Sequence, residues 1–98
     1  MLPVVFRPEA AVDVIEARQW YDNQQEGLGD DFGNALVDVV ERLQAMPLMY
    51  VIVVESVHRA KLRRFPYLLY YRVLENQIEV LAVLHSSRDP RLWRQRVR

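Results

Sequence analysis

The chain has 98 residues, of which 51% are hydrophobic and 27% charged, with no cysteine and a formal net charge of zero. This length supports a single domain with one modest core over residues 1–98, and the composition excludes a disordered chain. Disulfides and thiolate metal sites are excluded, and two well-separated histidines predict no zinc site. We therefore expect no metal and no cofactor.

The zero net charge conceals a division of the chain into two oppositely charged halves. Residues 1–55 carry ten acids and three bases, a sum of −7, whereas residues 56–98 carry three acids and ten bases, a sum of +7. Twelve of the thirteen bases are arginine, which suits bidentate contacts with carboxylates or phosphates. The basic half, residues 56–98, predicts a docking face for an acidic protein or nucleic acid. The alternative is a basic surface that only contacts solvent.

Two helices are predicted in the first half, after a short strand at residues 4–6. The first spans residues 8 to about 25, because a proline fits its first turn and apolar residues recur at spacings of three and four. The second begins near Asp30 and Asp31, whose carboxylates suit a helix N-terminus, and ends at residue 46 before a proline. Their short glycine-containing connection predicts an antiparallel hairpin.

The second half has the two-residue period of strands. Residues 50–55 are β-branched and predicted to be extended, and residues 58–64 alternate between Ala60 or Leu62 and basic side chains. Residues 68–74 and 78–85 have apolar residues on both faces, which predicts two covered strands. In the last strand, simple alternation places four residues on one face and Leu81 with Val83 on the other: Ile78, Val80, Ala82 and Leu84.

The predicted fold is α+β, in the order β-α-α-β-β-β with a short C-terminal helix that has Asp89 as its N-cap and Pro90 at its first position. Successive strands joined by tight turns predict an antiparallel sheet packed against the helical hairpin, with its other face partly open and basic. No segment resembles a signal peptide, and the apolar run at residues 48–54 is too short to span a bilayer. We expect a cytoplasmic protein with no membrane partner.

The end of the last predicted strand, His85-Ser86-Ser87, raises the question of catalysis. A serine-hydrolase site is disfavoured, because neighbouring strand residues point to opposite faces and no glycine-flanked nucleophile elbow is present. Metal-independent RNA cleavage is a stronger alternative, with His85 as acid or base and Lys61 and Arg64 stabilising the phosphorane. A histidine bonded to the backbone at a strand end is the simpler interpretation.

Two aromatic pairs, Trp20-Tyr21 and Tyr70-Tyr71, could stack on bases. Alternation predicts that one ring of each pair lies in the core, with its neighbour exposed or covered by another chain.

The sequence resembles the RelE/ParE superfamily of small bacterial toxins along nearly its whole length. The similarity includes GLGDDF at the start of the second helix, Phe65-Pro66-Tyr67 followed by LLYYRV, and IEVLAVLHSSRDPRLW at the end. The order and spacing of these pieces look closer to the ParE branch. The resemblance implies the same β-α-α-β-β-β fold and a cognate antitoxin with an acidic, helical C-terminal segment, bound in a hetero-oligomer.

The resemblance implies one of two activities. ParE-like members inhibit DNA gyrase by protein–protein contact, and RelE-like members cleave messenger RNA in the ribosome. A zero net charge and one lysine favour the ParE-like activity over a ribosomal polyanion site. An mRNA endonuclease with His85, Arg64 and Lys61 in its active site is the alternative, and an inert binding module of the same fold is a third hypothesis.

Binding residues are predicted on this basis for the two protein partners. The antitoxin should contact the basic strands and the exposed helical faces, through Arg59, Lys61, Arg63, Arg64, Trp20 and Tyr21. The target, gyrase in the favoured hypothesis, should contact the arginine-rich C-terminal segment through Arg88, Arg91 and Trp93.

Overall fold

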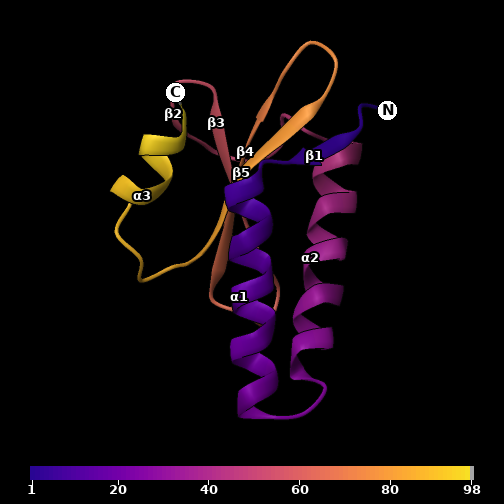
Figure 1. Ribbon diagram of the computed structural model, residues 1–98. Helices are drawn as coiled ribbons and strands as arrows, with labels where there is room; N and C mark the ends of the chain where they lie inside the picture. The colour runs from indigo at the N-terminus through magenta and orange to yellow at the C-terminus, as the bar shows by residue number, and fades with distance from the viewer. Residues whose placement is uncertain (98) are drawn as a thin grey trace.

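The computed structural model describes residues 1–97, and it consists of one five-stranded sheet with helices on both faces (Figure 1). The elements in chain order are β1 (Val4–Phe6), α1 (Pro8–Gln24), α2 (Leu28–Ala45), β2 (Ile52–Val54), β3 (Val57–Lys61), β4 (Tyr67–Val73), β5 (Ile78–His85), α3 (Arg91–Arg94) and the 3₁₀ helix η1 (Gln95–Val97). The α+β fold predicted from the sequence is confirmed. None of the helices in residues 1–97 is long and apolar enough to cross a bilayer.

The sheet has the order β1-β5-β4-β3-β2. Strands β2 to β5 pair antiparallel, as predicted, whereas β1 pairs parallel with β5, so the sheet is mixed. The segments at 50–55 and 58–64 form two separate strands, because the chain reverses at Glu55, where φ is 46°. Because β1 pairs with β5, the first and last strands of the chain are neighbours in the sheet.

The helical hairpin packs on one face of the sheet, where α1 and α2 lie side by side (Figure 1). Gly27, the N-cap residue before α2, has φ at 87°, a left-handed conformation suited to glycine. The start of α2 meets the end of α1 at Gly29, whose N–H donates to the Asp22 carboxylate at 2.7 Å. A Cβ at Gly29 would lie 2.6 Å from the Arg18 carbonyl oxygen, so only glycine allows this approach.

The core between hairpin and sheet contains buried residues from α1, α2 and the strands β3, β4 and β5, with Phe32, Leu43 and Tyr71 completely buried. A second, smaller core covers the other face. There, Tyr70, Leu81 and Leu84 pack beneath Trp93 of α3. The C-terminal segment covers part of this face, whereas Arg59 and Lys61 of β3 stay exposed on it, so the face is partly open and basic, as predicted. Both Tyr70 and Tyr71 are buried, where alternation predicted only one.

A β-bulge at Leu81 changes which face the end of β5 presents. Tyr71 pairs with Val80 and Tyr70 with Ala82, so Leu81 is an extra residue in β5. As a result Leu81 and Ala82 both join the smaller core, and Val83 returns to the core beneath the helices. The alternation predicted across residues 78–84 was therefore wrong after Val80. By the same shift, His85 lies on the helical side of the sheet.

Candidate functional site

A groove runs between the second half of α1 and the end of β5, where two adjoining depressions share Trp20, Tyr67, His85 and Arg88. We call it the α1–β5 groove. The depressions have volumes of about 180 and 450 Å³, and Asp13 and Glu16 of α1 line the smaller one. The groove thus combines aromatic rings, a histidine, an arginine and carboxylates in one place.

His85 is held in one tautomer by the turn that follows β5. The backbone N–H of Ser87 donates to His85 Nδ1 at 3.0 Å, and Ser87 Oγ lies 2.8 Å from the same nitrogen. Because Nδ1 accepts the backbone hydrogen, the neutral ring carries its proton on Nε2. The sequence prediction of a backbone-bonded histidine at a strand end is confirmed. In this tautomer Nε2 is a hydrogen-bond donor.

Tyr67 supplies the second polar group of the groove. Its ring meets His85 edge-on, with ring centroids 5.4 Å apart. Burial raises the pKa of Tyr67, nearby Tyr21 adds to the rise, and Arg88 opposes it. The hydroxyl therefore stays protonated at neutral pH and, like His85, presents a donor.

An aromatic cluster anchors the β3–β4 turn to the helical hairpin. Tyr21 stacks on Phe32 with centroids 5.6 Å apart and meets Phe65 edge-on at 4.8 Å. Tyr21 is thus mainly a packing residue, although its ring edge also lines the groove. Trp20, with 56% of its surface exposed, is the ring of this pair that is open to a partner.

The four basic residues predicted to bind an antitoxin lie on two different surfaces. Arg59 and Lys61 point to the face of the smaller core, where Arg59 lies near the buried Tyr70 and Lys61 donates to the Leu62 carbonyl oxygen at 3.1 Å. Arg63 and Arg64 lie in the β3–β4 turn, and Arg64 contacts Asp31 of α2 at 3.7 Å.

The alternative catalytic set of His85, Arg64 and Lys61 is not assembled. Lys61 pairs with Leu68, and Leu68 with Leu84, so these three residues share the face of the smaller core. His85 is one residue further along β5 and pairs with Tyr67 on the opposite, helical face. Arg64 is directed to α2 rather than into the groove. The sheet therefore separates the predicted lysine from the predicted histidine.

The three C-terminal residues predicted to bind the target occupy different environments. Arg88 lines the α1–β5 groove. Arg91 is exposed, and its Nε and Nη2 both donate to Asp89 Oδ2, at 2.9 and 2.6 Å; this contact holds the pKa of the Asp89 carboxyl below its ordinary value. Trp93 is only 4% exposed and stacks on Tyr70 with centroids 4.6 Å apart. Its ring therefore fastens the C-terminal segment to the sheet and is not at the surface.

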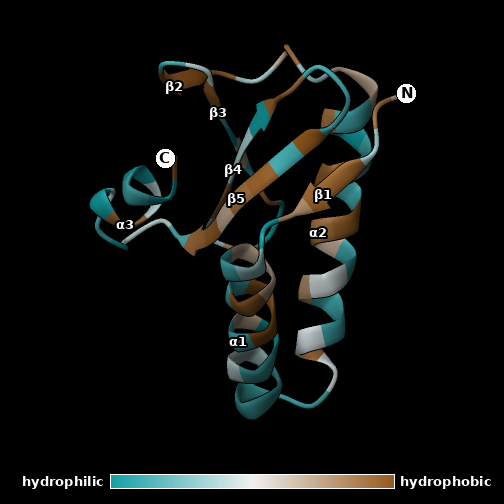
Figure 2. Cartoon of the chain, turned by 45° about the horizontal axis from the view of Figure 1, so that its top comes forward, coloured by the Kyte–Doolittle hydropathy of each residue, from teal (hydrophilic) through white to brown (hydrophobic). Residues whose placement is uncertain are grey.

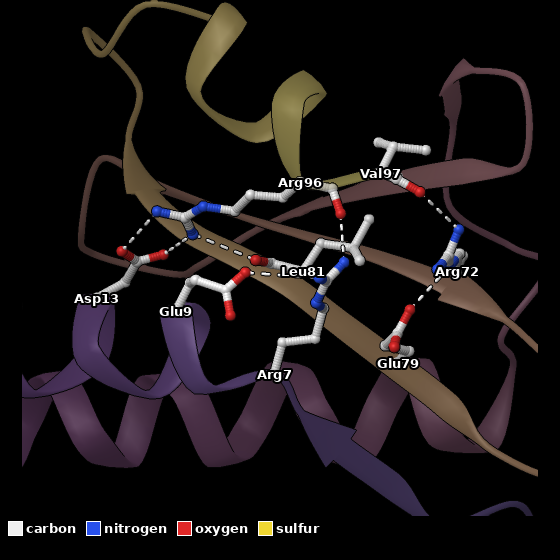
Figure 3. Close-up of polar contacts among 8 residues, drawn as sticks. All are labelled: Arg7, Glu9, Asp13, Arg72, Glu79, Leu81, Arg96 and Val97. Atoms are coloured by element: carbon white, nitrogen blue, oxygen red, sulfur yellow. Dashed lines mark hydrogen bonds and ion pairs between the residues drawn. The ribbon is translucent and has the colours of Figure 1, made fainter.

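Figure 3 shows a charged network, missed by the sequence analysis, that ties the two ends of the chain together. Arg96 pairs with Asp13 of α1 at 2.6 Å and also donates to the Leu81 carbonyl oxygen at 3.2 Å. Asp13 accepts the backbone N–H of Val83 at 3.0 Å. These side chains thus satisfy polar groups on the edge of β5 beyond the end of β1. The only signal in the sequence was the opposite charge of the two halves.

Arg7 and Arg72 complete this network. Arg7 donates to the Arg96 carbonyl oxygen and contacts Glu9. Arg72 bonds Glu79 at 2.7 Å and the Val97 carbonyl oxygen at 3.0 Å (Figure 3). Two arginines of the basic half, Arg72 and Arg96, are therefore used within the fold, and the positive surface left for a partner is smaller than the sequence sum indicates.

An apolar depression of about 290 Å³ lies on the helical side of the molecule, beside β1. Its lining is entirely apolar: Phe6, Ala11, Val14, Ile15 and Leu36. Val12 and Val37 on the same two helices are half exposed or more. We call this surface the helical groove, and it is suited to the apolar side of an amphipathic helix.

The mixed sheet, the helical hairpin on one face and the short C-terminal helix on the other define an α+β fold. A family model describing the ParE toxin of the type II toxin–antitoxin system parDE matches residues 4–90. The chain therefore belongs to the ParE toxin family.

A solved structure of the chromosomal ParDE toxin–antitoxin system from P. aeruginosa is similar to this chain, with a TM-score of 0.65. The alignment covers 87% of this chain and 96% of that one at 20% sequence identity, which establishes the shared fold. No curated protein matches the sequence.

Proposed function

We propose that this chain is a toxin that a cognate antitoxin neutralises, and that it inhibits DNA gyrase by protein–protein contact in the cytoplasm. The observation that carries the choice of target is the separation of the candidate catalytic groups. Lys61 lies on one face of the sheet and His85 on the other, and His85 Nδ1 is occupied by Ser87. Binding a protein target needs no assembled acid and base, whereas RNA cleavage does.

The antitoxin, in this proposal, covers the helical groove and continues over the basic residues. The apolar lining of the groove fits one side of an amphipathic helix. Arg59, Lys61, Arg63 and Arg64 supply positive charge for an acidic segment, and Trp20 supplies an exposed ring near the end of α1.

The gyrase contact is proposed at Arg88 and Arg91, next to the α1–β5 groove. Both arginines lie in the connection after β5 or the helix that follows it, and Trp93 fixes this segment on the sheet. Trp93 therefore contributes to target binding by positioning the arginines rather than by direct contact.

Expression without the antitoxin tests this function. We expect induction of the DNA-damage response and filamentation with intact transcripts, and inhibition of purified gyrase supercoiling by the purified chain. Reversal of Arg88 and Arg91 to glutamate should weaken gyrase inhibition at least about tenfold, since charge-assisted contacts are worth about 1.5–3 kcal/mol each. Arg94→Glu, on the same segment, is the matched control and should retain inhibition.

One observation favours a second candidate, the mRNA endonuclease. The α1–β5 groove brings His85, Tyr67, Arg88 and Trp20 together, which would give two donors, a cation and a stacking ring for a nucleotide. Rapid loss of translated messages, abolished by His85→Ala, would establish the endonuclease and refute gyrase as target. Unimpaired growth with the folded chain present would refute both activities and leave an inert binding module.

A further inference from the structure

The connection from α2 to β2 carries an exposed apolar patch that the proposed function does not use. Five large side chains on it each expose more than half of their surface: Met46, Leu48, Met49, Val51 and Ile52. No charged residue occurs between positions 46 and 54. We call this patch the apolar edge, because it runs into β2, coloured brown in Figure 2, at the end of the sheet farthest from β1.

Buried side chains hold the backbone of the apolar edge in place. Tyr71 Oη donates to the Pro47 carbonyl oxygen at 2.6 Å, and His58 Nδ1 bonds the Tyr50 carbonyl oxygen at 2.8 Å. Burial raises the pKa of Tyr71 to about 12, so its hydroxyl remains a donor at neutral pH. The backbone is thus anchored inward while the apolar side chains project outward. A partner meets a preformed surface and loses little entropy in ordering it.

The two edges of the sheet differ in their protection against strand pairing. β1 and β2 are both three residues long, but β1 is flanked by Pro3, Arg7 and Pro8, which interrupt pairing beyond it. β2 pairs only with β3 and contains only isoleucine and valine, with no charge or proline to block a further strand. An edge of this kind is a template for another strand.

We propose that the apolar edge is a self-association surface, at which β2 of a second copy of this chain pairs antiparallel with β2 across a two-fold axis. Antiparallel pairing of identical strands satisfies two-fold symmetry, because each residue meets the same patch on the other copy. The two sheets then continue through the interface, and the apolar side chains pack around the strand pair.

The exposed area of the apolar edge and its lack of charge both favour a second copy of this chain as the partner. Five large side chains that are more than half exposed form a patch on the order of 500 Å². Two such patches bury about 1,000 Å², which reaches the lower limit of a specific, weakly associating interface. A neutral patch meets its own copy without charge repulsion, whereas a charged antitoxin segment would gain no complementary charge from it.

Sedimentation of the purified full chain over about 1–300 µM tests the proposal in the range expected for a small interface. We expect a reversible monomer–dimer equilibrium. Ile52→Lys should weaken dimerisation at least about tenfold, since a lysine would be buried at the centre of the apolar contact. Leu48→Glu is a second variant, and Val37→Lys, on an exposed apolar residue of α2, is the matched control that should dimerise normally.

Disulfide cross-linking of an introduced cysteine tests whether the apolar edge is the dimer interface. The chain has no cysteine of its own that would compete. Ile52→Cys should form a disulfide-linked dimer at least about tenfold faster than Val37→Cys, since antiparallel partners place their Cα atoms about 5.5 Å apart. A chain that stays monomeric at about 300 µM, or a dimer unaffected by Ile52→Lys and Leu48→Glu, would overturn the proposal. Weakened antitoxin binding by Ile52→Lys in a monomeric chain would assign the patch to the antitoxin instead. None of these outcomes depends on the gyrase target.

Discussion

Arg64 holds a left-handed backbone conformation, with φ at 71°, in the β3–β4 turn. This conformation costs a non-glycine residue about 1–2 kcal/mol. Its side chain lies over the Phe65 ring at 5.4 Å and contacts Asp31 at 3.7 Å, with 65% of the arginine side chain exposed. These exposed contacts are worth too little to explain the strained arginine, and a role in partner binding is consistent with it.

Replacement of Arg64 by glycine distinguishes the effect of its strained backbone on stability from the effect of its charged side chain on antitoxin binding. We expect Arg64→Gly to change the free energy of unfolding by less than about 1 kcal/mol, because relief of strain offsets the lost contacts. Antitoxin affinity, measured by calorimetry, should fall about tenfold. Glu55→Gly is the matched control, since Glu55 also has a positive φ, of 46°, but carries the opposite charge. Wild-type affinity in Arg64→Gly would remove Arg64 from the antitoxin site.

At the scale of the elements, the close crossing of α1 and α2 depends on Gly29. We expect Gly29→Ala to destabilise the protein by about 1–3 kcal/mol, because the added methyl group would meet the backbone oxygen of Arg18 at 2.6 Å. Gly33→Ala, in the same helix, should be neutral or stabilising by up to about 1 kcal/mol. Its methyl group would approach only the flexible Arg18 side chain at 3.3 Å. Denaturant unfolding of both variants measures the difference, and equal costs would contradict it.

The predictable part of the fold is set by local patterns. Prolines at positions 8 and 47 and the apolar periodicity located both helices to within about two residues, and alternation correctly buried Ala60 and Leu62. The bulge at Leu81 could not be predicted, because β5 is apolar on both faces and an inserted residue leaves no trace in its pattern. The bulge also determines the face of the sheet on which His85 lies, so the α1–β5 groove could not be predicted from the sequence.

At the scale of the whole molecule, the opposite charges of the two halves are partly used to close the fold. Asp13 and Arg96 are 83 positions apart and their side chains are only 11% and 19% exposed. The sequence sum indicated an entire basic half available to partners. Long-range pairs of this kind depend on the final topology, in which the C-terminal segment returns to α1, and no local pattern encodes them.

A double-mutant cycle on Asp13 and Arg96 measures this closure. We expect Arg96→Met to cost about 2–4 kcal/mol of the free energy of unfolding, because Asp13 is left largely buried without its counter-ion. Asp13→Asn should also destabilise, and the double variant should lose about 1–3 kcal/mol less than the two single losses together. Asp30→Asn, which breaks the exposed Arg18–Asp30 pair, is the control and should cost less than about 1 kcal/mol. Additive losses would show that the pair contributes no coupling.

The parallel pairing of β1 with β5 also governs when the protein can fold during its synthesis. Val4 pairs with Ile78 and Phe6 with Val80, so β1 cannot join the sheet until β5 has left the ribosome. Contacts of such sequence separation form late and slowly. The helical hairpin, by contrast, is complete by Ala45 and can form earlier. The helical groove borders the hairpin and β1, so an antitoxin that recognised the hairpin alone could engage a nascent toxin before its arginine-rich end exists.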